Sequence, residues 1–194
     1  MKSMQPPVLM QQVILKSHPR GEPKLEDFAL ETVAQPTPVE GEVLLRTLWL
    51  SLDPLIRFAI DEVVLTGVAK VKIGEVLYGG AVSQVVESRH PDFHVGEFVE
   101  GRSGWREFAA INPAQIKLRK IDSTAGSLSL ALGVLGMPGQ TAHACMIGVG
   151  RVAKGECVVI SAAAGAVGST AGQIGKILGA RVVGIAGGAK NAKR

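Results

Sequence analysis

The sequence predicts a mixed α/β protein, in which a β-rich, partly open barrel precedes the first part of a parallel α/β domain. Three observations predict this fold class. Short β-branched and apolar runs, separated by turns rich in glycine and proline, fill residues 8–111. The pattern changes to helical spacing at residues 127–135, and residues 157–188 read as strand, small-residue turn, helix and strand. We therefore expect two domains, residues 1–126 and 127–194.

The N-terminal module is predicted to contain short strands with one helical turn among them. Asp53 followed by Pro54 is typical of a helix start, with Asp53 as the N-cap and residues 55–60 as the helix. Short strands with turn residues between them favour a small barrel. The predicted strands are residues 8–15, 28–33, 42–52, 82–87, 97–101 and 105–111.

The C-terminal module is predicted to begin with helical residues 127–135, a break at residues 136–141 and a second helix at residues 141–148. The apolar, β-branched run that follows Cys157 suits a parallel strand covered on both faces. The next helix is expected to end near Leu178 with Gly179 as its C-cap. We expect Val167, Ile174, Ile177 and Leu178 to supply its buried side.

The turn between strand and helix is a candidate dinucleotide site. Its spacing is Ala162-x-x-Gly165-x-x-Gly168. Gly165 would let the backbone approach a pyrophosphate, and Gly168 would let the helix lie close to the strand. The free N–H groups at the helix start would hold the anion. The alternative is a glycine-rich turn without a ligand, but the flanking strands favour the dinucleotide. No Gly-Lys-Ser/Thr follows, which excludes a Walker-type phosphate loop.

The end of the second strand favours NADP(H) over NAD(H). In NAD-binding units an acidic residue there accepts hydrogen bonds from the ribose 2′-hydroxyl. No acidic residue occurs after Glu156, and Lys190, Lys193 and Arg194 lie close to the expected position. Cationic groups suit a 2′-phosphate, which a carboxylate would repel. The alternative is that these charges form a solvated tail.

The composition excludes several other classes of protein. The chain has 194 residues, 46% hydrophobic residues and a net charge of +4, as an ordinary globular protein does. It contains neither a nucleic-acid motif nor about twenty successive apolar residues, so we expect no nucleic-acid partner and no membrane contact. Cys145 and Cys157 are expected to be reduced and buried, as in a cytoplasmic protein. The four histidines lack neighbours at ligand spacing, so no metal site is expected.

Five motifs carry a family resemblance. Gly-Met-Pro-Gly at residues 136–139 and Ala-Ala-Ala-Gly-Ala-Val-Gly at residues 162–168 are its most specific parts. With residues 50–57, 85–93 and 182–188, they resemble the zinc-free, NADPH-dependent double-bond reductases of the medium-chain dehydrogenase/reductase superfamily. These include prostaglandin reductases, plant alkenal reductases and bacterial curcumin reductases. The resemblance covers nearly the whole chain but only the first part of a typical member, so we expect a C-terminally truncated relative.

This resemblance implies a GroES-like N-terminal domain and a partial Rossmann domain. It also implies hydride transfer from NADPH to the β-carbon of an α,β-unsaturated ketone or aldehyde. Full-length members are homodimers; the segment that usually forms the dimer is absent here. We therefore do not expect this chain to dimerise in that way.

The resemblance implies roles for individual residues but names no catalytic residue. Members usually carry tyrosine at the positions of Leu55 and His143, which places these two in the substrate pocket. His143 as a structural residue and His143 as a proton donor both stay open. Asn191, with Lys190 beside it, aligns with the lysine that meets the 2′-phosphate. The cofactor-binding residues implied are Met137, Thr141, Gly165, Ala166, Val167, Gly168, Gly187, Lys190 and Asn191.

Two other functions remain open. A truncated, non-catalytic product could bind a nucleotide or a partner protein through the edge of its incomplete sheet. A zinc-free NADPH:quinone reductase of the same superfamily would share the dinucleotide turn. Tests with enone and quinone substrates separate these possibilities.

Overall fold

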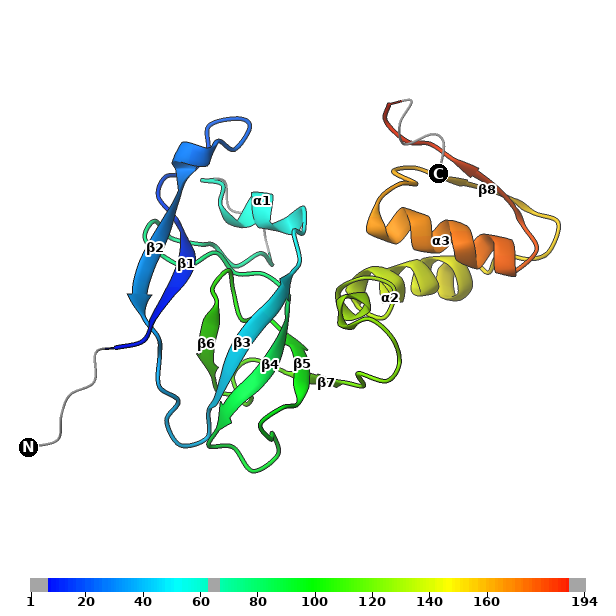
Figure 1. Cartoon of the computed structure of the whole chain (residues 1–194). Coiled ribbons are helices and arrows are strands. Elements are labelled where there is room, and N and C mark those ends of the chain that lie inside the picture. Colours follow the sequence, from blue (N-terminus) through cyan, green and yellow to red (C-terminus); the bar gives the residue numbers. More distant parts are fainter. Residues whose placement is uncertain (1–6, 63–66, 189–194) are drawn as a thin grey trace, which may run out of the picture. The chain divides into compact units, whose positions relative to one another are not determined.

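The computed structural model describes residues 7–62 and 67–188 (Figure 1). The chain divides between Ala125 and Gly126 into two compact units. The first contains two antiparallel sheets, and the second contains helices and a parallel strand pair. This confirms the predicted mixed α/β class, with a β-rich first unit that does not close into a barrel.

The first unit is built from a two-stranded and a five-stranded sheet. Strands β1 (Leu9–Leu15) and β2 (Phe28–Ala34) pair with each other, with the 3₁₀ turn η1 (Leu25–Asp27) between them. The larger sheet has the order β6-β3-β4-β5-β7 and is antiparallel throughout. Its strands are β3 (Val43–Leu50), β4 (Ala81–Ser88), β5 (Phe98–Gly101), β6 (Phe108–Ile111) and β7 (Arg119–Ile121).

Two apolar clusters form the core of this unit. Alternate residues of the larger sheet, among them Leu45, Val85 and Val99, fill one cluster, because side chains at every second position share a face. The other cluster joins Leu15 at the end of β1 to helix α1 (Leu55–Ala59), which buries Ile56 and Ala59 in it. Helix α1 is thereby held against the sheets by its apolar side.

The start of α1 differs from the prediction in its capping. The Asp53 carboxylate accepts a hydrogen bond from the Ser51 hydroxyl at 2.8 Å. Only the backbone oxygen of Asp53 serves the helix, accepting the Ile56 N–H at 3.0 Å. Pro54 is the N-cap, in helical conformation and without a side-chain cap. The helix forms where expected, but the predicted carboxylate cap is wrong: the Asp53 carboxylate pairs with Ser51 instead.

The second unit begins with the 3₁₀ turn η2 (Leu128–Leu132), helix α2 (Met137–His143) and the π-helical turn η3 (Ala144–Val149). The predicted break at residues 136–141 is wrong, because Pro138 occupies the first turn of α2, where its missing N–H costs nothing. Strand β8 (Cys157–Ile160), helix α3 (Ala166–Ile177) and strand β9 (Arg181–Gly184) follow, and β8 and β9 pair in parallel.

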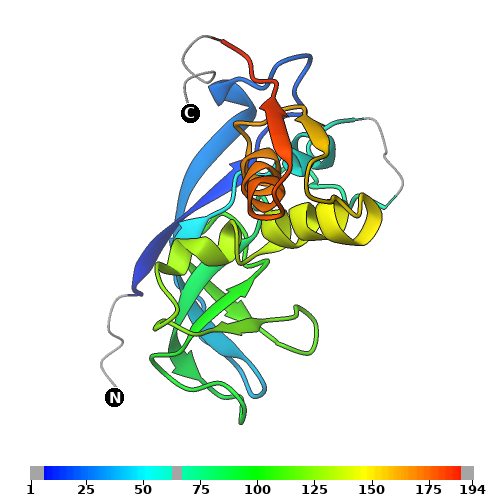
Figure 2. The same ribbon diagram turned by 90° about the vertical axis from the view of Figure 1, so that its right-hand side faces the viewer.

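Helix α3 lies against the β8–β9 pair (Figures 1 and 2). Val158 and Ile160 pack towards a small core of Ala142, Met146 and Ala171. Val159, on the opposite face of β8, is 61% exposed, so the prediction of a strand covered on both faces is wrong for the described residues. Cys145 and Cys157 are free as predicted, but both are exposed rather than buried.

Candidate nucleotide-binding site

The turn after β8 is fixed to the end of β9 by backbone hydrogen bonds. The N–H of Ala163 donates to the oxygen of Ile185 at 3.0 Å, and the N–H of Ile185 donates to the oxygen of Ile160 at 2.8 Å. Within the turn, the Gly165 N–H donates to the Ala162 oxygen at 2.9 Å. The parallel pairing of β8 and β9 therefore holds the turn that opens α3.

Ala162 has a φ of 49°, in the left-handed region that glycine adopts without cost. The sequence reasoning placed Ala162 in the motif but did not predict this conformation. The signal was available, because the first position of such turns is usually a glycine that permits a tight reversal. Alanine has the smallest side chain that can replace it.

The start of α3 offers unpaired donors. Gly165 is the N-cap and supplies no side-chain hydrogen bond, and the first N–H groups of a helix have no acceptor inside it. Gly165, Ala166 and Val167 are exposed. The N–H groups of Ala166 and Val167 and the positive end of the helix dipole are suited to an anion such as a pyrophosphate.

Gly168 is buried where α3 crosses its own entry turn. A Cβ there would lie under 3.0 Å from the oxygen of Ala162, and 2.9 Å from the Cα of Ala163. Since real Cβ atoms do not approach backbone so closely, only glycine lets the helix start this near the turn. The residues present therefore fit the backbone cradle that a dinucleotide pyrophosphate requires.

Farther along α3, glycine again allows close packing. A Cβ at Gly175 would lie 2.9 Å from Cγ2 of Val182 and 3.2 Å from Cε of Met146. The predicted apolar side of the helix is correct for Ile174, which packs on the core. It is wrong for Ile177, which is 83% exposed, and for Val167, also exposed. The face of α3 that meets β9 is made of small residues instead.

Met137 and Thr141 lie together on the exposed side of α2. The Thr141 hydroxyl donates to the Met137 backbone oxygen at 2.8 Å and lies 3.5 Å from its Sδ. Met137 is 60% exposed within the part of the chain that the structure describes. Gly136 and Gly139 flank the start of this helix, and a Cβ at either would lie under 3.0 Å from a preceding backbone oxygen. The two glycines of the Gly-Met-Pro-Gly motif therefore let α2 begin close to the end of η2 and to the turn that follows it.

The remaining predicted residues are distributed over both units. His143 is exposed at the end of α2, Leu55 opens α1 in the first unit and is 42% exposed, and Gly187 is exposed after β9. Lys190 and Asn191 lie outside the described residues.

Two features are absent from residues 7–62 and 67–188. No group of three or more His, Cys, Asp or Glu side chains there could hold a metal ion. No helix in these ranges is both long and apolar enough to cross a membrane.

The chain has a β-rich unit, and after it a strand, a glycine-containing turn, a helix and a second, parallel strand. This is the order found in oxidoreductases in which a β-domain precedes a dinucleotide-binding domain. Residues 11–118 match the family described as the N-terminal domain of oxidoreductase, and the chain belongs to this family.

Named relatives confirm the resemblance that the motifs predicted. The chain is 46% identical over 180 residues to the NADPH-dependent curcumin reductase of Escherichia coli, covering 93% of this chain and 51% of that protein. It is 41% identical to the NADP(+)-dependent 2-alkenal reductase of Nicotiana tabacum, covering 91% of this chain and 52% of that protein. The chain thus spans about half the length of these relatives.

A solved structure gives the same result for the fold. CurA from Vibrio vulnificus, crystallised in complex with NADPH, is 42% identical and superposes with a TM-score of 0.85. The match covers 93% of this chain and 52% of that one.

Proposed function

We propose that this chain is the substrate-binding and nucleotide-binding part of an NADPH-dependent reductase of the C=C bond of α,β-unsaturated ketones and aldehydes. The observation that carries the proposal is the glycine cradle at Ala162–Gly168, with exposed helix N–H groups beside it. Relatives named as NADPH-dependent curcumin reductase and 2-alkenal reductase support the substrate class. We assign the substrate role to the first unit and the nucleotide role to the second.

In this proposal the second unit holds NADPH, which supplies a hydride when it is bound. The N–H groups of Ala166, Val167 and Gly168 bind the pyrophosphate, and Gly165, whose own N–H donates to Ala162, lets the backbone approach it. Met137 and Thr141, whose side chains touch each other on α2, lie near the nicotinamide. A cofactor held by backbone groups is positioned without cost in side-chain entropy.

The preference for NADPH over NADH is assigned to the segment after β9. Gly187 leaves room for a 2′-phosphate, since a Cβ on it would meet nothing within 4 Å. Lys190 supplies the positive charge and Asn191 an amide donor. No carboxylate stands in residues 157–194 to repel the phosphate.

Leu55 and His143 are proposed to line the substrate pocket. Leu55 offers an apolar surface without the phenol that relatives usually carry there. His143 can donate a hydrogen bond to the oxygen of an enolate, or a proton to its α-carbon. The enolate would otherwise be stabilised by nearby polar groups.

The reductase assignment also leads to proposals on the location, the substrates and the oligomeric state of the protein. We propose a cytoplasmic enzyme that acts on small molecules. We also propose that the complete protein is a homodimer.

The test is oxidation of NADPH by the complete protein with enones, enals and quinones, followed by the loss of NADPH absorbance. The proposal predicts saturable turnover with an enone or enal and little with quinones. Turnover confined to quinones would overturn this proposal and favour the NADPH:quinone reductase instead. Absence of turnover with all of them, despite NADPH binding, would leave a nucleotide-binding protein without this activity.

A further inference from the structure

Helix α1 is too short to hold its own position. It has five residues, and isolated helices of fewer than about a dozen residues are marginal in water. Its buried side chains, Ile56 and Ala59, fix one face against the core. Leu55 and Phe58, three residues apart, are 42% and 48% exposed. The place of Leu55 therefore depends on what holds the rest of the helix.

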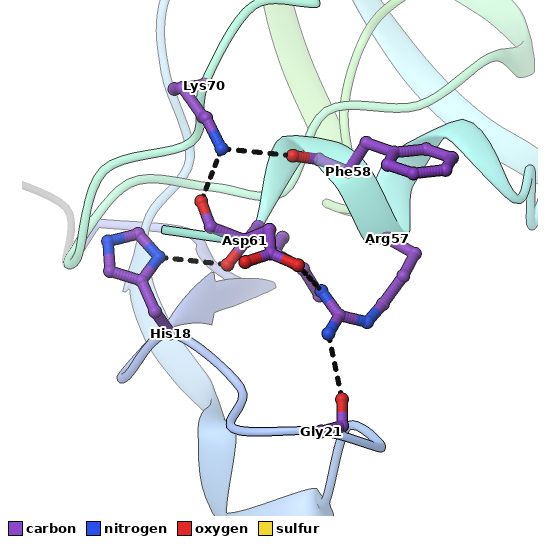
Figure 3. A network of polar contacts seen from close by, with 7 residues as sticks. His18, Gly21, Arg57, Phe58, Asp61 and Lys70 are labelled. Carbon is purple, nitrogen blue, oxygen red and sulfur yellow. Dashed lines mark hydrogen bonds and ion pairs between the residues drawn. The ribbon is translucent and has the colours of Figure 1, made fainter. Parts of the chain in front are cut away.

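Three groups from other segments bind the carbonyl end of α1 (Figure 3). The Nζ of Lys70 donates to the oxygen of Phe58 at 3.2 Å and to the oxygen of Asp61. The Nδ1 of His18 donates to the oxygen of Ile60 at 2.9 Å, and the Val71 N–H donates to Ala59 at 3.0 Å. A helix leaves its last carbonyls without partners, and a cation there also suits the helix dipole.

Arg57 holds α1 through hydrogen bonds of its side chain. Its Nη1 donates to Oδ2 of Asp61 at 2.7 Å, and its Nη2 donates to the backbone oxygen of Gly21 at 2.8 Å. The side chains of Arg57 and Asp61 are only 33% and 31% exposed, so the pair is partly shielded from solvent. One of these directed bonds ties α1 to the loop after β1, and the other joins Arg57 to Asp61, just past the end of the helix. In Figure 3 the Phe58 ring points away from this network.

We propose that Arg57, Lys70 and His18 are positioning residues, which hold α1 so that Leu55 keeps its place in the substrate pocket. The inference rests on the proposed function, because the reductase assignment is what puts Leu55 in that pocket. None of the three needs to touch the substrate. They act through the backbone of α1, to which Lys70 and His18 bind directly.

A purely stabilising role has a different signature. Loss of stability lowers the amount of folded protein and the melting temperature but leaves the KM of the folded fraction unchanged. Loss of positioning raises KM for the enone. The affinity for NADPH stays as it is in both cases, because Gly165–Gly168 belong to the other compact unit.

The test measures enone KM, kcat and NADPH affinity in the complete protein for Lys70→Met, Lys70→Arg and Arg57→Lys. Lys72→Met is the matched control, because Lys72 lies in the same loop and its side chain is 82% exposed. Lys70→Met is expected to raise KM about tenfold, since losing about 1.4 kcal/mol of apolar contact with the enone weakens binding tenfold. Lys70→Arg is expected to restore part of the loss, and Arg57→Lys to raise KM as well, because lysine cannot make both directed bonds.

A double-mutant cycle tests whether the effect passes through Leu55. In the Leu55→Ala background, Lys70→Met is expected to raise KM much less than in the wild type. An enone KM for Lys70→Met and Arg57→Lys equal to that of Lys72→Met would overturn the positioning role while the reductase assignment stands. An equal effect of Lys70→Met in both backgrounds would overturn the role of Leu55. If Lys70→Met does not fold, the enone KM of Arg57→Lys decides whether the positioning role stands. A wild type without enone turnover overturns the proposed function, and this inference with it.

Discussion

A Cβ on Gly168 would lie under 3.0 Å from the backbone oxygen of Ala162, so α3 can begin where it does only with glycine at that position. The same two residues bracket the turn whose N–H groups are proposed to bind a pyrophosphate. The close packing of α3 and the proposed binding of a pyrophosphate at its start therefore both depend on glycine at position 168.

Gly168→Ala is expected to displace the start of α3 from the turn. Overpacking of this kind costs about 1–3 kcal/mol of folding free energy. Urea unfolding measures that loss, and nucleotide titration is expected to show weaker binding of NADPH because the donors move.

Gly172→Ala is the matched control in the same helix. A Cβ there would meet Val182 at 3.7 Å, an ordinary contact. Alanine is favoured over glycine in a helix interior by up to about 1 kcal/mol, so this variant is expected to be as stable as the wild type or more so. Equal losses in both variants would show that the contact with Ala162 is not what matters.

Substitutions of Ala162 test the backbone conformation at the first position of the turn. At a φ of 49° glycine relieves strain but adds freedom to the unfolded chain, so Ala162→Gly is expected to change stability and NADPH affinity little. Ala162→Val places a β-branched residue in the left-handed region, where such residues are genuine outliers, and is expected to lower stability below that of the wild type. Thermal unfolding of the two variants measures this; a valine variant as stable as wild type would contradict the assigned conformation.

Gly187 tests the origin of the nucleotide preference. Gly187→Asp supplies the carboxylate that NAD-binding units carry and is expected to weaken NADPH binding by about tenfold or more through repulsion of the 2′-phosphate, while NADH binding is kept. Gly187→Asn has nearly the same shape without the charge. Titrations of both variants with both nucleotides measure the effect, and equal behaviour of Asp and Asn would remove charge as its cause.

Asp27 gives the first unit a pH-dependent component of stability. The backbone N–H of Lys24 and then the hydroxyl of Ser17 donate to its carboxylate, which lowers the pKa of Asp27 below its ordinary value. Because the folded-state pKa is lowered, this stabilisation is present above the unfolded pKa of about 3.9 and is lost as the pH falls through the folded pKa. Asp27→Asn is therefore expected to be less stable than wild type at neutral pH, and the difference is expected to shrink in acid.

Urea unfolding at a series of pH values measures this difference. Glu22→Gln, which changes an exposed carboxylate in the loop just before η1, is the control and is expected to change stability little at any pH. A deficit of Asp27→Asn that stays constant down to acidic pH would contradict the account.

Local pattern predicted most of the fold because most elements are set by local chemistry. The β-branched run after Cys157 and the glycine at 179, which has a φ of 80°, mark the strand and the helix end by rules that need no tertiary information. Strand β7 was not predicted: Arg119–Ile121 is too short and polar to signal a strand, and it forms through pairing with β5.

The candidate site was predictable to a similar degree. Spacing and resemblance pointed to the residues of the turn, since the phosphate cradle is a backbone device with a sequence signature. The hydrogen bond from Ala163 to Ile185 and the contact between Met137 and Thr141 depend on how the chain folds back on itself. The network of His18, Arg57 and Lys70 joins residues that are 42, 36 and 12 positions apart in the chain, and no local pattern predicts these contacts.

The most direct test of the central claim is titration of the 194-residue chain with NADPH and with NADH, followed by nucleotide fluorescence. The account predicts saturable binding that strongly prefers NADPH and that is weakened by Gly168→Ala but not by Gly172→Ala. Absence of NADPH binding by a chain whose circular dichroism shows it folded would contradict the assignment of the turn as a nucleotide site.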